Sequence, residues 1–177
     1  MKTQEFLLYS KPVWFISYYF PKRSGLFDDY SQLILDFKNK DPKAFIHFYE
    51  LIYHWITNYS PYNDCFVCAV PSSKMKFTNA ITLAAQKIAI YLPDVSDGTH
   101  FVQAVKSRKS FCMGAKRNAA EIINSIVVDD NVAGKNILLL DDVASSGISL
   151  STIASLLLMK NAKSVCCLAL AQTYQSF

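Results

Sequence analysis

One stretch, from Asn136 to Leu150, constrains the fold of this chain more than any other. It reads N-I-L-L-L-D-D-V-A-S-S-G-I-S-L. Its apolar run, Ile137 to Leu140, is typical of a short strand covered on both faces by helices, and such strands belong to parallel sheets. Two carboxylates, Asp141 and Asp142, follow at the expected end of that strand, and a Ser-Ser-Gly turn comes next. Apolar residues at positions 150, 153, 154, 157 and 158 then predict an amphipathic helix.

The turn before this helix has the residues that a phosphate site needs. The first turn of a helix presents backbone N–H groups and the positive end of the helix dipole. Ser145, Ser146 and Ser149 would add hydroxyl donors, and Gly147 allows close approach of the backbone or a φ that a side chain would resist. Two acids beside a phosphate would repel a bare anion, so we expect their partners to be neutral hydroxyls or a cation. A sugar phosphate with free hydroxyls meets both conditions.

The segment I-L-L-L-D-D-V-A-S-S-G-I-S resembles the signature of type I phosphoribosyltransferases, which bind phosphoribosyl pyrophosphate. That signature is an apolar strand, two acids, an apolar pair and Thr-Thr-Gly-x-Thr; serine replaces each threonine here and keeps its hydroxyl. The resemblance implies that Asp141 and Asp142 are catalytic, hold the ribose hydroxyls and bind Mg2+, in part through water. It also implies that the turn binds the ribose phosphate, through Ala144, Ser145, Ser146, Gly147, Ile148 and Ser149. Purine-salvage members carry an Asp where this chain has Ser145, and this departure argues against a purine-salvage role.

The acidic strand end has two other interpretations. A hydrophobic run followed by Asp-Asp also resembles the magnesium-binding strand of P-loop nucleotide hydrolases. No G-x-x-x-x-G-K-[ST] motif occurs in the chain, so this interpretation fails. A merely structural strand turn is the other alternative.

Length and composition indicate one globular domain. The chain has 177 residues, of which 51% are apolar, enough for a sizeable core. Aromatic residues gather before residue 62, so we expect residues 1–60 to form a hood that is part of the same unit as a core over 61–177. No apolar run approaches the roughly 18 residues that span a bilayer, and Lys11 and Pro12 interrupt the start too soon for a secretory signal. These features predict a cytoplasmic protein without membrane association.

The cysteines and histidines offer little chemistry. Cys65 and Cys68 have the spacing of a zinc knuckle, but strand alternation would point them to opposite faces, and no second knuckle occurs. We interpret them as buried strand thiols, as in a reducing compartment. Cys112 lies among basic residues, but no base for a catalytic thiol is visible. His47 and His54 share the polar face of a predicted helix with charged residues and are expected to be solvated.

Two further segments carry candidate ligands. After a predicted strand over 65–70 comes a loop, Pro71 to Lys74, which in a parallel sheet would face the same crevice as Asp141. It is either an ordinary turn or, as the resemblance implies, a pyrophosphate loop with contacts from Ser72, Ser73 and Lys74. The other segment follows residue 105 and contains, without any acid, Lys106, Arg108, Lys109, Lys116 and Arg117.

This basic segment resembles the flexible catalytic loop of the family, in particular that of the competence-protein-F-like (ComF-like) branch, where a basic loop precedes R-x-x-N. Arg117-Asn118 is the nearest equivalent here. The resemblance implies that Lys109 and Arg117 are catalytic and that Arg108 and Lys116 bind pyrophosphate. The alternative is a nucleic-acid patch that would bind single-stranded DNA. The four-cysteine zinc module that often begins members of this branch is missing.

The overall prediction is an α/β fold with a parallel sheet of about five strands flanked by helices. The core strands are expected at 65–70, 101–105, 125–128, 137–140 and 165–171, with a further strand in the hood at 13–20. By resemblance the protein is a phosphoribosyltransferase that uses magnesium and displaces pyrophosphate with a nitrogen nucleophile, a nucleobase or another amine. The alternative is a non-catalytic module that senses phosphoribosyl pyrophosphate or binds single-stranded DNA in DNA uptake. A homodimer is a further expectation.

Overall fold

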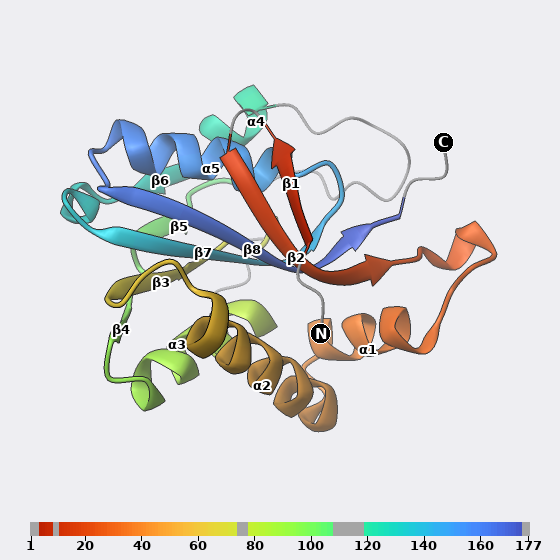
Figure 1. Ribbon diagram of the computed structural model, residues 1–177. Coiled ribbons are helices and arrows are strands. Elements are labelled where there is room, and N and C mark those ends of the chain that lie inside the picture. The colour runs from red at the N-terminus through yellow and green to blue at the C-terminus, as the bar shows by residue number, and fades with distance from the viewer. Residues whose placement is uncertain (1–3, 9–10, 74–77, 108–118, 175–177) are drawn as a thin grey trace.

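A single mixed sheet runs through the computed structural model, which describes residues 4–8, 11–73, 78–107 and 119–174 (Figure 1). In these residues the strand order is β1-β2-β8-β7-β3-β4. Strand β1 (Gln4–Leu8) pairs antiparallel with β2 (Lys11–Tyr19), and every other neighbouring pair is parallel. The remaining strands are β8 (Ser164–Thr173), β7 (Asn136–Ala144), β3 (Cys65–Ala69) and β4 (Val95–Asp97). The predicted α/β class, with five parallel strands, is confirmed.

Helices cover both faces of this sheet (Figure 1). One face carries α1 (Asp29–Lys38), α2 (Pro42–Tyr59) and α3 (Ala80–Tyr91). The other carries α5 (Ile148–Met159), α4 (Ala119–Ile123) and a two-stranded antiparallel ribbon of β5 (Val102–Ala104) and β6 (Ile126–Val128). Short 3-10 turns, η1 (Lys22–Ser24) and η2 (Asp130–Val132), complete the described elements. None of the described helices combines the length and the apolar character that crossing a membrane requires.

Strand β7 divides the core into two clusters because its side chains alternate between the faces. Leu138 and Leu140 belong to the cluster under α1, α2 and α3, together with Trp55. Ile137 and Leu139 belong to the cluster under α5. All four β7 residues are at most 1% exposed, as expected for a central strand of a parallel sheet.

The N-terminal helices show the expected aromatic packing. Asp28 caps the N-terminus of α1, where its carboxylate accepts the Ser31 N–H, and Asp41 caps α2, which has Pro42 as its first residue. The Phe37 ring packs against Phe48 with ring centroids 5.1 Å apart, edge to face. The first helices are thereby joined by aromatic contacts beneath the sheet.

Three strand predictions need correction. The strand predicted at 13–20 exists as β2 over 11–19, and it lies in the main sheet beside β8. Residues 101–105 are not the second core strand; β5 pairs with β6, so the strand predicted at 125–128 also lies in the ribbon and not in the sheet. The second core strand is β4, within a segment predicted as a polar loop. Only Val95 of β4 is buried, so this edge strand has no apolar run to reveal it. The division into a hood and a core stays a prediction.

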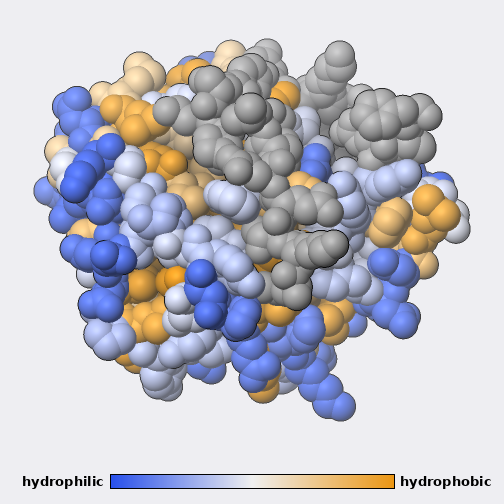
Figure 2. Space-filling model, in the orientation of Figure 1, coloured by the Kyte–Doolittle hydropathy of each residue, from blue (hydrophilic) through white to orange (hydrophobic). Residues whose placement is uncertain are grey.

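The surface of the face shown in Figure 2 mixes hydrophilic and hydrophobic residues. Over the coloured part of this view the hydrophobic residues form separate groups and not one continuous patch. The homodimer stays a prediction.

Candidate functional site

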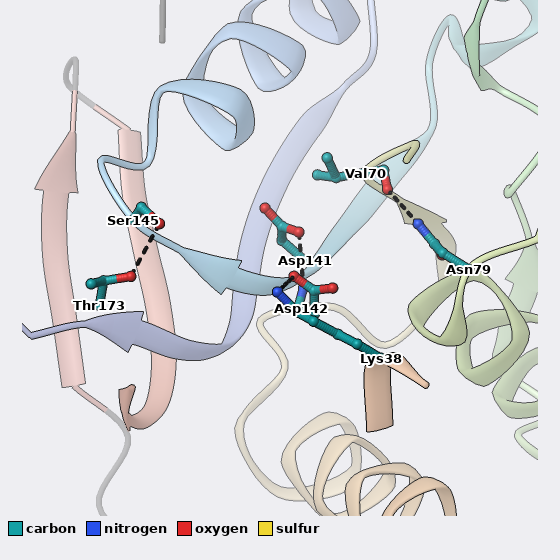
Figure 3. Close-up of polar contacts among 7 residues, drawn as sticks. All are labelled: Lys38, Val70, Asn79, Asp141, Asp142, Ser145 and Thr173. Atoms are coloured by element: carbon teal, nitrogen blue, oxygen red, sulfur yellow. Dashed lines mark hydrogen bonds and ion pairs between the residues drawn. The ribbon is translucent and has the colours of Figure 1, made fainter. Parts of the chain in front are cut away.

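The acid pair lies inside β7 and not after it. The sequence predicts a strand that ends at Leu140, but pairing with β8 continues through Asp141, Val143 and Ala144, opposite Ala169, Ala171 and Gln172. Backbone hydrogen bonds with β8 keep the chain extended at the two acids, although their side chains are polar. Alternation along a strand then directs the two carboxylates toward different faces of the sheet, as Figure 3 shows.

The two acids have different environments. Asp141 is 8% exposed, and its Oδ1 accepts the Asp142 backbone N–H at 2.9 Å. The Asp142 side chain is 26% exposed, and its Oδ1 lies 3.2 Å from the Lys38 ammonium at the end of α1 (Figure 3). Lys38 was missed by the sequence analysis, because no local pattern connects a residue of the N-terminal helices with the acidic strand. Asp142 therefore has a lysine partner from helix α1.

The serine turn connects β7 to α5 as predicted. Gly147 has φ +67° and ψ −3°, the left-handed conformation that glycine adopts with least strain. Gly147 is the N-cap residue of α5. Because glycine has no side chain, it makes no capping hydrogen bond to the N–H groups of the first turn. Ser145 is exposed, and its Oγ accepts a hydrogen bond from Thr173 Oγ1 at 3.1 Å. The other predicted contacts vary in burial: Ala144 and Ser149 are buried, whereas Ser146 and Ile148 are half-buried.

A cleft of about 450 Å³ lies beside the carboxyl end of β3. Its walls come from the loop after β3, the first half of α3, and the β5 segment with the residues just before it. They comprise Ala69, Pro71, Ser72, Asn79, Thr82, Gln86, Thr99, His100, Val102, Gln103 and Ala104. Most of these side chains are polar and uncharged, so the described walls can offer hydrogen-bond donors to an anion or to a hydroxylated ligand. Ser72 lines the cleft and Ser73 is half-buried, and their roles as pyrophosphate contacts stay predictions.

Asn79 fixes the beginning of α3 against the end of β3. Its Oδ1 accepts hydrogen bonds from the Thr82 N–H at 2.8 Å and from Thr82 Oγ1 at 2.7 Å. Its Nδ2 donates to the Val70 carbonyl at 3.2 Å (Figure 3). Asn79 was not named from the sequence, although Asn before an apolar helical stripe is a recognisable N-cap signal. This contact holds the N-terminal end of α3 at the wall of the cleft.

The acid pair, the serine turn and the cleft lie together at the carboxyl ends of the central strands. In Figure 3 the acid pair lies between the Ser145–Thr173 contact and the Val70–Asn79 contact. The three strands involved, β8, β7 and β3, are neighbours and parallel, and each feature lies at or near a carboxyl end. Crevices of this kind are where ligands collect in open α/β sheets. This arrangement agrees with the sequence prediction, in which the loop after β3 faces the same crevice as Asp141.

Several predicted site residues fall outside the described residues. They are Lys74, Arg108, Lys109, Lys116 and Arg117, as are Phe111 and Cys112. Lys106 is described and exposed. The pyrophosphate and catalytic roles predicted for the basic segment therefore stay predictions.

No group of three His, Cys, Asp or Glu side chains within the described ranges could hold a metal ion. Cys65 and Cys68 point into different core clusters, as predicted from strand alternation. Burial raises the pKa of Cys65 to about 11, with a smaller contribution from the Asp64 charge, and raises the pKa of Cys68 further. Such thiols are poor metal ligands, because a metal binds the thiolate. His47 and His54 are exposed, as expected.

The acid pair itself suits a hard cation of the magnesium type. Magnesium is commonly held by one or two carboxylates, with water and substrate phosphates completing its shell. Asp141 and Asp142 point toward different faces of the sheet, so each offers one carboxylate on its own face, and neither is a soft ligand that would favour zinc. Either carboxylate fits a magnesium ion that completes its shell with water and phosphate oxygens, rather than a cage built entirely from protein.

No protein-family profile matches this chain, and no curated protein matches it. Several solved structures resemble it. A hypoxanthine-guanine phosphoribosyltransferase from Bacillus anthracis is 20% identical with a TM-score of 0.39, over 77% of this chain and 64% of that one. An adenine phosphoribosyltransferase from Saccharomyces cerevisiae is 15% identical with a TM-score of 0.45, over 78% of this chain and 81% of that one. A Trypanosoma cruzi hypoxanthine phosphoribosyltransferase is 11% identical with a TM-score of 0.39, over 76% of this chain and 64% of that one.

The chain thus spans less than two thirds of the length of the Bacillus and Trypanosoma enzymes. These likenesses are too distant to give any residue of this chain a role. The function must be inferred from the site itself.

Proposed function

We propose that this protein binds phosphoribosyl pyrophosphate with magnesium and displaces the pyrophosphate with a nitrogen nucleophile. One observation carries the proposal: a pair of carboxylates in β7 lies between a hydroxyl-rich helix N-terminus and a polar cleft that contains a second helix N-terminus. A ligand with hydroxyls at its centre and a phosphate group on each side matches this order.

The ribose 5-phosphate half would bind at β7 and the turn after it. Carboxylates accept hydrogen bonds from hydroxyls, so Asp141 and Asp142 suit the two ribose hydroxyls. The phosphate would accept hydrogen bonds from the serine hydroxyls and from first-turn N–H groups of α5, where the helix dipole favours an anion. Gly147 would keep the turn free of a side chain at the phosphate.

The pyrophosphate half would bind in the cleft beside β3. Ser72 offers a hydroxyl there, and the N-terminus of α3 offers its dipole. Ser73, Lys74, Arg108 and Lys116 are further proposed contacts, and Lys109 and Arg117 are proposed catalytic residues. These basic groups would neutralise charge on the leaving group and exclude water as a lid.

The reaction breaks the bond between the ribose anomeric carbon and the pyrophosphate oxygen and forms a bond from that carbon to nitrogen. Positive charge develops on the sugar and negative charge on the leaving group. Catalysis is then mainly positioning together with electrostatic stabilisation by Asp141, Asp142 and the basic loop. Asp141 or Asp142 would hold magnesium when it is bound, and the ion would supply additional charge neutralisation for the leaving pyrophosphate.

Ligand binding provides the first test. Phosphoribosyl pyrophosphate with magnesium should raise the melting temperature, because a ligand that binds only the native state stabilises it. The double variant Asp141→Asn/Asp142→Asn should fold but lose the shift. Asp130→Asn is a matched control, since it removes an exposed carboxylate that pairs with Lys160 away from the acid pair. An unchanged shift in the double variant would refute the assignment of the ribose hydroxyls.

Turnover provides the second test. Pyrophosphate release should appear when a panel of nucleobases and other amines is offered as acceptor. Binding without release for every acceptor would instead favour the non-catalytic sensor.

A further inference from the structure

We propose that Lys38 is a built-in counter-ion of the acid pair, one that lets the site bind a sugar phosphate with less dependence on a divalent cation. This inference rests on the proposed function, because it assigns a role at the same site. The observation behind it is the 3.2 Å contact between the Lys38 ammonium and Asp142 Oδ1. Lys38 acts through Asp142 and is therefore a positioning residue and not a catalytic one.

The backbone around Lys38 is held firmly. Its neighbour Phe37 is fully buried among aromatic rings, and the N–H groups of Asn39 and Lys40 bond back to the carbonyls of Leu35 and Phe37 respectively. At the other end of α1, the Tyr30 hydroxyl donates to the Leu170 carbonyl of β8 at 2.8 Å. Helix α1 is thus tied to the sheet beside β7. The lysine stem starts from a defined position, which lowers the entropy cost of holding its ammonium at Asp142.

A lysine at a helix C-terminus has an ordinary explanation, because the negative end of the dipole favours a cation there. That explanation accounts for the residue type but not for its direction toward the carboxylate. The other ion pair among the described residues, Lys160 with Asp130, shows the contrast: the Asp130 side chain is 85% exposed, whereas that of Asp142 is 26% exposed. A carboxylate shielded from water interacts more strongly with its counter-ion than an exposed one does.

The electrostatic consequence follows from the ligand. Two carboxylates would place two negative charges beside the phosphates, and Lys38 compensates one of them. Removing its charge should weaken binding of an anionic ligand and should strengthen binding of a divalent cation, which no longer competes with the ammonium for Asp142. Opposite changes for anion and cation are the signature of a counter-ion, because a local structural defect would weaken both.

The experiment uses the full-length protein and two probes, ribose 5-phosphate and Mn2+. Ribose 5-phosphate affinity is measured by calorimetry without divalent metal, and Mn2+ affinity is measured by the electron paramagnetic resonance of free Mn2+. The variants are Lys38→Met, Lys38→Arg, Asp142→Asn and the double variant Lys38→Met/Asp142→Asn. Lys160→Met is the matched control, since it breaks an ion pair of the same chemistry away from the acid pair. Circular dichroism and melting curves establish that each variant folds.

We expect Lys38→Met to weaken ribose 5-phosphate binding by up to about fivefold, the range of a partly exposed ion pair. Mn2+ should bind more tightly, Lys38→Arg should restore both affinities, and Lys160→Met should change neither. In the Asp142→Asn background the gain in Mn2+ affinity on Lys38→Met should shrink, because the carboxylate for which the ammonium and the metal compete is already gone.

Two outcomes overturn the proposal in distinguishable ways. In the first, the wild type binds ribose 5-phosphate and Asp142→Asn lowers this affinity, but Lys38→Met leaves the affinities for ribose 5-phosphate and Mn2+ unchanged or lowers both. Only the role of Lys38 is then wrong. If the wild type binds no ribose 5-phosphate with or without Mg2+, the proposed function is wrong and the role of Lys38 falls with it.

Discussion

Replacement of Gly147 by alanine tests whether the turn before α5 is a ligand site or only a connection. Gly147 has φ +67°, and an L-residue in this conformation costs roughly 1–2 kcal/mol. Gly134 provides the matched control, because it has φ +73° and a Cβ there would meet nothing within 4 Å. Gly134→Ala therefore measures only the free-energy cost of placing an L-residue in the left-handed conformation. We expect both variants to lose about 1–2 kcal/mol of unfolding free energy.

The two variants should differ in ligand binding. Gly147 is buried at the N-cap of α5, so a methyl group or a relaxed turn there moves the N–H groups and hydroxyls proposed to bind the phosphate. A loss of two or more of these hydrogen bonds, each worth about 1 kcal/mol, predicts an affinity for ribose 5-phosphate at least about tenfold lower. Urea denaturation gives the stability and calorimetry gives the affinity. Wild-type affinity in a folded Gly147→Ala protein would refute the phosphate site, and an equal loss in Gly134→Ala would attribute the effect to stability.

Two further predictions concern stability. Tyr30→Phe removes the hydroxyl that donates to the Leu170 carbonyl, so it should lower the unfolding free energy by about 1 kcal/mol. Urea denaturation measures this loss. An unchanged urea midpoint would show that the hydrogen bond does not tie α1 to the sheet. Stability should also fall between about pH 9 and 11, because burial raises the folded-state pKa of Cys65 from 9.0 to about 11, so the unfolded chain loses this proton first. Urea titrations across this range should show a smaller fall in Cys65→Ala, and an equal fall would assign the pH dependence to other groups.

The sheet was predictable where burial left a pattern in the sequence. β3, β7 and β8 are central strands, and their apolar runs indicate this directly. β4 is a three-residue edge strand with one buried side chain, which no periodicity can reveal. Phe101 and Val102 are as buried as core-strand residues, but Val102 begins a strand of the separate ribbon, and both pack in the cluster under α5. Burial is therefore readable from sequence, whereas the identity of a strand's neighbour is not.

The site was predictable where its residues are local. The serine turn and the two acids lie within one segment, so their common location followed from the order of residues alone. The opposite directions of Asp141 and Asp142 were not predicted, because the sequence gives no sign that β8 continues to pair beyond Leu140. The Lys38 and Thr173 contacts join distant segments, and neither could be inferred without the fold.

The place of β2 has a consequence for how this chain reaches its native state. Val13 of β2 is opposite Cys167 of β8, a separation of 154 residues. Parallel pairing across such a distance requires closure of a long loop, and the entropy cost of that closure comes before any stabilising contact forms. Folding is therefore slow. During synthesis β2 has only β1 to pair with until the last described strand leaves the ribosome. Val13 and Phe15, which pack in the cluster under α5, stay exposed for most of that time, so chains interrupted before β8 should aggregate through this N-terminal hairpin.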